Sequence, residues 1–225
     1  MIELHGGDAR YFGDAGDASP AVAAAVTAYA EGTGSEHAVL AALASSRLLV
    51  PVVAMPAEDV TERSEMATPV LVGRDGRRAL VAFTCADAVR RWQPAARPVP
   101  VPAAAVFQQA SAEAGAVVID VAGPVPVAVE GARLAALAGG EQPPRMFEDP
   151  DVWRLVAAAA GRVAPGIRVR LTEPEPGAEF TLELAPPPGV PGLVPEDLAT
   201  RIAAAVREQL AERVRSAVAV VRRPG

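Results

Sequence analysis

The 225-residue sequence predicts an α+β fold in two small domains, with mixed or antiparallel sheets packed against helices. Three observations lead to this prediction. Pairs of extended segments are joined by short turns that contain Gly or Pro. The small, Pro-rich stretch 139–144 breaks the chain into two parts. The second part shows the order helix, strand, strand, helix, strand, and two of its strands alternate between apolar and polar residues.

The expected domain boundaries follow from these breaks. Residues 1–18 are polar and rich in Gly and Asp, so we expect them to form a flexible lead-in. Residues 19–139 form the first expected domain, residues 140–149 the linker and residues 150–225 the second domain. Domains cluster near ~100–150 residues, so a chain of this length suits two small domains.

The first domain is expected to open with two helices. Ser19 followed by Pro20 is a typical helix start, with Ser as the N-cap and Pro at the first helical position. This helix should end at about Glu31, where Gly32 follows. A second helix is expected over residues 36–45.

Strands come next. An apolar run over residues 47–54 predicts a strand, and Pro51 favours an edge position or a bulge because it has no N–H to donate. Strands at 70–72 and 79–84 flank the turn 73–77, in which Asp-Gly is a strong hairpin signal. The rest of this domain is expected to contain a helix at 85–92, an extended Pro-rich stretch at 94–102, a helix at 103–114, a hairpin of strands at 117–121 and 125–129, and a helix at 132–138.

The second domain begins with another helix. Asp149 followed by Pro150 repeats the N-cap signal, and Gly161 is expected to end this helix. Two strands, at 167–173 and 178–184, alternate apolar and polar residues. This alternation predicts an antiparallel pair with one side facing solvent.

The longest helix is expected over residues 195–213, because apolar residues recur there at steps of four. They are Leu198, Ile202, Val206, Leu210 and Val214. A last strand is expected over residues 216–221.

Composition excludes several classes of protein. Cys85 is the only cysteine, so no disulfide can form within the chain, and with two His residues we expect no metal site and no cofactor. No apolar run approaches the ~18 residues of a membrane span and the N-terminus does not resemble a signal peptide. We therefore expect a soluble cytoplasmic protein with no membrane partner. The net charge of −6 also argues against nucleic-acid binding.

Positive charge is concentrated in residues 63–97, which carry seven Arg and three acidic residues, a net charge of +4 between acidic flanks. Two interpretations stay open for this segment. It is either ordinary solvated surface or a docking site for an unidentified protein partner, which we expect to be acidic and which could be the chain's own N-terminal segment. The candidate interaction residues are Arg74, Arg77, Arg78, Arg90 and Arg91.

Cys85 carries the only candidate thiol chemistry. Its spacing to Arg91 is that of thiol phosphatases, but the residues between them include no Gly to admit a phosphate. Thr84 and Asp87 also have the spacing of a variant capping box at a helix start. We therefore favour a structural role for Cys85 and expect no catalytic residue.

Several residue strings of the first domain form a recognisable set: LLVPVV at 48–53, SEMATP at 64–69, GRRALVAFT at 76–84, the pair Arg91-Trp92 and PVPVP at 98–102. Taken together, these strings resemble the N-terminal domain of the SseB family, the enhanced serine sensitivity proteins. The resemblance covers about residues 20–139, and residues 150–222 more weakly resemble the C-terminal domain that often follows. It implies no established reaction, cofactor or catalytic residue. It also implies a small hydroxyl residue at the position of Cys85, so the thiol is not required.

Two functions stay open. The first is a non-enzymatic cytoplasmic interaction or regulatory module, because no catalytic constellation stands out and two small domains are linked. The alternative is a small-molecule-binding or thiol-dependent enzyme, with a site in the cleft between the two domains or at Cys85. Convergence of titratable residues in a pocket would favour the alternative.

Overall fold

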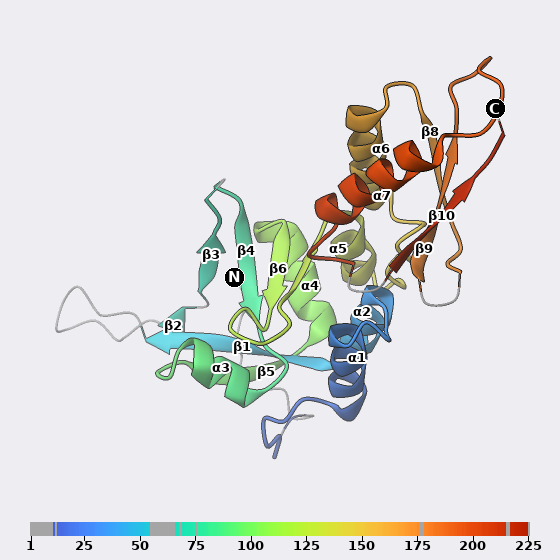
Figure 1. Ribbon diagram of the computed structural model, residues 1–225. Coiled ribbons are helices and arrows are strands. Elements are labelled where there is room, and N and C mark those ends of the chain that lie inside the picture. The colour runs from blue at the N-terminus through green and yellow to red at the C-terminus, as the bar shows by residue number, and fades with distance from the viewer. Residues whose placement is uncertain are drawn as a thin grey trace. The chain divides into compact units, whose positions relative to one another are not determined.

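A computed structural model describes residues 11, 13–54, 66–67, 69–74, 76–175, 178–214 and 217–224 (Figure 1). In chain order its elements are α1 (Pro20–Ala30), α2 (Glu36–Ala44), β1 (Arg47–Ala54), β2 (Met66–Ala67), β3 (Val70–Val72), β4 (Arg78–Ala82), α3 (Ala86–Trp92), β5 (Arg97–Pro102), α4 (Ala103–Glu113), β6 (Ala116–Ile119), β7 (Val127–Glu130), α5 (Gly131–Ala138), α6 (Pro150–Val163), β8 (Arg168–Thr172), β9 (Ala178–Ala185), α7 (Glu196–Gln209) and β10 (Ala217–Arg222). The predicted α+β fold class is confirmed.

The chain forms two compact units. Unit 1 comprises residues 1–26 and 40–143, and unit 2 comprises residues 27–39 and 144–225. Residues 27–39 contain the turn between α1 and α2. This short segment therefore belongs to unit 2, although more than a hundred residues separate it from the rest of that unit.

Unit 1 contains two sheets, with the strand orders β2-β1-β5 and β3-β4-β6-β7. No bulge occurs at Pro51, because β1 pairs with β5 in an unbroken register, but the expected one-sided pairing is present at this residue. Pro51 lies opposite Pro98. Its missing N–H falls on the other side of β1, where Leu49 bonds Phe83 and no strand among the described residues pairs with residue 51. Neither residue has an N–H, so the two form a non-hydrogen-bonded pair of the antiparallel ladder. On its other side β1 pairs with β2 only at Val53 and Ala54.

Both predicted hairpins of unit 1 are present. β3 pairs with β4 and β6 pairs with β7 in antiparallel fashion, whereas β4 and β6 are parallel, so this sheet is mixed. The expected Pro-rich extended stretch forms β5. Helix α4 packs against α5 and β6. A buried cluster that includes Leu49, Val81, Phe83 and Val89 joins β1, β4 and α3.

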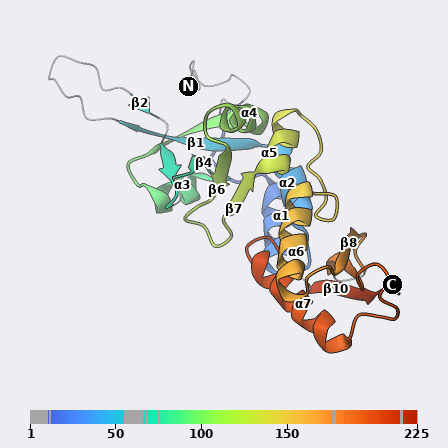
Figure 2. The ribbon, with the colours of Figure 1, turned by 90° about the horizontal axis from the view of Figure 1, so that it is seen from above.

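Unit 2 has the predicted order helix, strand, strand, helix, strand, and its sheet has the order β10-β9-β8. β8 and β9 are antiparallel as expected, and β10 runs parallel to β9. α6 packs against α7 and β8, while α7 also packs against β10. The two helices lie side by side in both views (Figures 1 and 2). Phe180, Leu182, Ile202 and Val206 are fully buried in the core between helices and sheet.

The two predicted helix starts are confirmed. Ser19 Oγ accepts a hydrogen bond from Val22 N at 3.3 Å, and Asp149 Oδ1 accepts one from Asp151 N at 2.8 Å. The expected end of α6 at Gly161 is wrong, because the helix continues to Val163. A Gly within a helix costs only about 1 kcal/mol relative to Ala, and packing of the rest of α6 outweighs that cost.

The side of β9 that was expected to face solvent is partly buried by other residues of unit 2. Glu179 is 8% exposed and Thr181 is 3% exposed. β9 is the central strand of its sheet, and Thr181 Oγ1 accepts a hydrogen bond from Glu175 N at 3.2 Å. Glu36, from the segment 27–39, interacts with the Glu179 carboxyl group. Alternation along the strand alone could not reveal this second layer, because it comes from a distant part of the sequence.

Candidate functional site

Three of the five candidate arginines lie on the β3–β4 hairpin, and we call Arg74, Arg77 and Arg78 the hairpin arginines. All three are exposed. Arg77 Nη1 lies 2.7 Å from Glu130 Oε2 at the end of β7, so this guanidinium has an ion-pair partner. Gly73 N donates a hydrogen bond to Arg77 O at 2.8 Å, which closes the turn between the two strands.

An apolar side chain lies among the hairpin arginines. Val72, the last residue of β3, is 69% exposed and pairs across the ladder with Arg78. Exposed single apolar residues are common on protein surfaces. What distinguishes Val72 is that its neighbours across the turn are exposed cations, which gives the hairpin both apolar and charged contact groups.

The other two candidates, Arg90 and Arg91, lie in the last turn of α3, where we call them the helix arginines. Both are exposed, and Arg90 forms an ion pair with Asp87 one turn earlier. β4 begins at Arg78, and α3 follows the other end of that strand (Figure 1). The structure therefore places the two groups of arginines at opposite ends of β4 and does not bring all five together.

The capping box expected at the start of α3 is wrong. Cys85 occupies the N-cap position with no side-chain cap hydrogen bond. Thr84 binds Asp120 instead: its Oγ1 donates to Oδ2 at 2.7 Å and its N–H to Oδ1 at 2.9 Å. Asp120 has a φ of 52°, in the left-handed region that Asp tolerates better than most residues. Burial raises the pKa of Asp120, and the hydrogen bonds from Thr84 oppose that rise.

The geometry around Cys85 does not provide a phosphate loop. The residues between Cys85 and Arg91 are helical, so the two residues lie six positions apart, or about 9 Å along the α3 axis. The first amide of the helix is already occupied, because Ala86 N donates to Gly16 O at 2.7 Å. This arrangement does not support the thiol phosphatase hypothesis.

Part of the expected lead-in makes specific contacts in unit 1. Arg47 binds Asp14 in a bidentate manner, with Nε to Oδ2 at 2.7 Å and Nη2 to Oδ1 at 2.9 Å. Arg47 Nη1 also donates to Thr84 O at 2.6 Å. The hydrogen bond from Arg47 holds the pKa of Asp14 below its usual value. Arg47 thus links the lead-in to the segment that begins α3.

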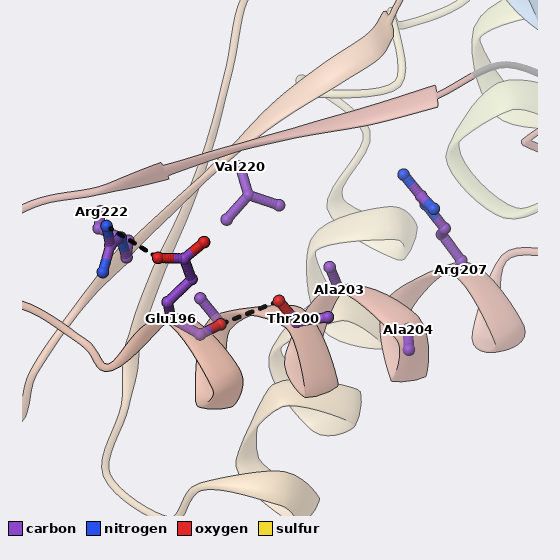
Figure 3. A pocket seen from close by; sticks show the side chains of 8 residues that line it. Glu196, Thr200, Ala203, Ala204, Arg207, Val220 and Arg222 are labelled. Atoms are coloured by element: carbon purple, nitrogen blue, oxygen red, sulfur yellow. Dashed lines mark hydrogen bonds and ion pairs between the residues drawn. The ribbon is translucent and has the colours of Figure 1, made fainter.

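Unit 2 contains a groove that the sequence did not predict. It has a volume of about 480 Å³ and runs between α7 and β10 (Figure 3). Arg207 lies at one end of the groove. At the other end, Arg222 Nη2 lies 3.9 Å from Glu196 Oε2. The small side chains Ala203 and Ala204 leave room along the helix. Those small residues were the only sequence signal, and the abundance of Ala in this chain hides it.

A second feature of unit 2 that sequence analysis missed is a buried ionic cluster. Arg213 Nη2 donates hydrogen bonds to Glu36 Oε2 and to Asp149 Oδ2, both at 2.8 Å. Tyr29 Oη donates to Arg213 O at 2.8 Å. Glu36, Asp149 and Arg213 have side chains only 8%, 0% and 14% exposed. Two carboxylates and one guanidinium are thus held together away from solvent.

Glu179 lies at the edge of this cluster. Burial, and to a smaller extent the negative charge of Glu36, raises the pKa of Glu179 to about 7. Its Oε1 is buried and has no hydrogen-bond partner among the described residues. Glu179 therefore titrates near neutral pH, unlike an exposed glutamate.

In the part of the chain that the structure describes, no group of three or more His, Cys, Asp or Glu side chains is arranged to hold a metal ion. None of the helices in that part is both long enough and apolar enough to cross a membrane.

Comparison with protein families matches the first part of the chain. The family described as SseB protein N-terminal domain matches residues 22–136, about half of the chain and most of unit 1. The match ends before α6, so the resemblance of residues 150–222 to an SseB C-terminal domain stays a prediction. Comparison with curated proteins and with solved structures found no match.

Proposed function

This chain belongs to the SseB family through its N-terminal domain, and from that premise we propose that it is a non-enzymatic cytoplasmic interaction or regulatory module. It docks an acidic protein partner, and the hairpin arginines make the contact. The main observation in support of this proposal is the β3–β4 hairpin, where the exposed side chain of Val72 lies among exposed arginines.

The chemistry of the hairpin suits this role. Arg presents a planar fork of donors that matches a carboxylate, and apolar residues together with Arg are typical of interface cores. Arg74 has no carboxylate partner among the described residues, so its donors are available to another protein. Arg77 already holds Glu130, and this pair would fix the guanidinium beside the docking surface.

The helix arginines contribute less to the proposed contact. Arg90 is engaged by Asp87 on its own helix, and both helix arginines lie at the far end of β4 from Val72. A single flat partner surface would therefore reach the hairpin without reaching α3. This separation provides a matched control, because two pairs of neighbouring arginines can be changed independently.

The test measures association kinetics with a partner captured from native lysate on the immobilised full-length chain. Charges at an interface rim mainly set the association rate and its salt dependence. We expect Arg77→Ala with Arg78→Ala to slow association at least about threefold at low ionic strength and to flatten its salt dependence. Arg90→Ala with Arg91→Ala should leave both unchanged. Unchanged kinetics in the hairpin variant, or equal effects of both variants, would contradict the proposal.

A further inference from the structure

The groove in unit 2 lies beside a free sheet edge. β10 is the terminal strand of the β10-β9-β8 sheet, and no strand among the described residues pairs with its other side. Arg223 N donates to Leu184 O of β9 at 2.8 Å. Because backbone groups alternate along a strand, the N–H groups of Val220 and Arg222 point away from β9. They are donors that a further strand could use.

The groove has the dimensions of an added strand. On α7 its lining runs from Glu196 to Arg207, which is about 16 Å along the helix axis. At ~3.3 Å per residue, an extended peptide of about five residues covers that length. Val220, 37% exposed, borders the groove from the β10 side, and Ala203 and Ala204 border it from the α7 side.

The charged side chains at the two ends of the groove favour an acidic peptide. Within the described residues, the Arg207 guanidinium makes a single weak hydrogen bond, to Val218 O at 3.4 Å, and has no carboxylate partner. At the other end, Glu196 lies 3.9 Å from Arg222 and partly neutralises it. A carboxylate is therefore favoured at the Arg207 end, and small apolar side chains are favoured between Val220 and the alanines.

We propose that the α7–β10 groove binds an extended acidic peptide, which adds to β10 as a fourth strand and places a carboxylate on Arg207. Main-chain hydrogen bonds to the β10 edge provide affinity, and the arginine with the alanine-lined wall provides selectivity. A second copy of this chain is a poorer occupant, because it would bring its own Arg207 and Arg222 to the same edge. This site is separate from the hairpin arginines and belongs to the other unit.

The test uses the full-length chain and a fluorescein-labelled peptide of alternating aspartate and valine, with a lysine–valine peptide of equal length as control. Fluorescence anisotropy should show binding of the aspartate peptide only. Arg207→Glu should weaken it at least about tenfold, because it replaces a charge-assisted contact with a repulsion. Arg201→Glu, on the exposed side of the same helix and outside the groove lining, should change it less than about twofold.

A backbone variant separates strand addition from simple charge attraction. Val220→Pro removes an outward N–H without removing a ladder bond to β9, and edge strands tolerate such a proline. It should weaken binding at least about tenfold, whereas Val220→Ala should retain most of it. Hydrogen exchange should show peptide-dependent protection of the Val220 and Arg222 amides.

Three results would overturn the proposal: equal binding of the lysine–valine peptide, unchanged binding to Val220→Pro, or a dimer in light scattering that dissociates in Val220→Pro. The last would make a second copy the occupant. The changes at Arg77 and Arg78 should not affect this peptide, so failure here is distinguishable from failure of the hairpin proposal.

Discussion

Arg213 donates hydrogen bonds to both carboxylate oxygens of Glu36, a residue 177 positions earlier in the chain. Its Nε lies 3.3 Å from Oε1 and 3.2 Å from Oε2, and its Nη2 lies 2.8 Å from Oε2. The same guanidinium binds Asp149 at the start of α6. This contact explains how the segment 27–39 becomes part of unit 2. The buried negative charge of Glu36 and the buried positive charge of Arg213 neutralise each other, so the two distant parts of the sequence stay together.

Removing Arg213 should therefore destabilise the protein strongly. Arg213→Ala removes the guanidinium that binds the buried carboxylates of Glu36 and Asp149, and breaking a buried pair in this way costs about 3–5 kcal/mol. The free energy of unfolding from urea titration measures the loss. Arg90→Ala is the matched control, because Arg90 and Asp87 pair at the surface with side chains 65% and 70% exposed, and exposed pairs contribute about 0–1 kcal/mol. Equal losses in the two variants would contradict a special role for the cluster.

Glu179 should make stability depend on pH. Its pKa is raised to about 7 in the folded state, from 4.5 when unperturbed, so the folded protein holds this proton at pH values where the unfolded chain has released it. The contribution of Glu179 to stability is thus complete below about pH 4.5 and is lost as the pH rises to 7. The loss amounts to about 3 kcal/mol.

Glu179→Gln should remove this dependence. The difference in unfolding free energy between variant and wild type should grow in favour of the variant from pH 4.5 to 7 and then stay constant. Glu183→Gln, four residues along the same strand, is the control. A constant difference for Glu179→Gln over the whole range would show that Glu179 titrates normally.

Local signals predicted most of the fold. Ser19 and Asp149 mark helix starts through bonds to residues two or three positions away, and the two hairpins of unit 1 follow from their turn residues. The errors arose where tertiary contacts override local preference. Gly161 does not end α6, and Pro51 lies in the middle strand of its sheet at a residue where that strand pairs on one side only. Neither outcome is visible in a window of neighbouring residues.

The candidate sites were less predictable. The five arginines stand out by charge, and the strand expected at 79–84 already separates the hairpin arginines from the helix arginines, although the net charge of residues 63–97 treats them as one group. Glu179 looked like an ordinary solvent-facing residue of an alternating strand, and its burial depends on Glu36 from the first helical pair. Likewise the groove depends on how α7 crosses β10. These features join residues that are far apart in sequence.

The linker region should be the first site of proteolysis. Residues 139–142 are exposed and contain no helix or strand, so limited digestion is expected to cut there before cutting within 150–225. The released C-terminal fragment lacks Tyr29 and Glu36, so it should unfold at a lower temperature than unit 2 does in the intact chain. Mass spectrometry of the fragments and their melting curves check both statements. First cleavage inside 150–225 would contradict the expected boundary.

Cys85→Ser should stabilise the protein slightly and leave its function unchanged. Cys85 is the N-cap of α3, with φ −143° and ψ 160°, and its side chain makes no cap hydrogen bond. Ala86 N is already bound to Gly16 O, but a serine hydroxyl could accept from the free amide of Asp87 or Ala88. The expected gain is about 0.5–1 kcal/mol in unfolding free energy, since Ser is a preferred N-cap residue.

Cys85→Ala serves as the control for this prediction, because it removes the thiol without adding an acceptor. It should show no gain in stability. If partner binding or any measured activity is lost in both variants while their melting temperatures hold, the thiol itself is required and the structural role of Cys85 is wrong. If Cys85→Ser gains stability and Cys85→Ala does not, with function retained in both, Cys85 acts only as an N-cap residue whose side chain makes no cap hydrogen bond.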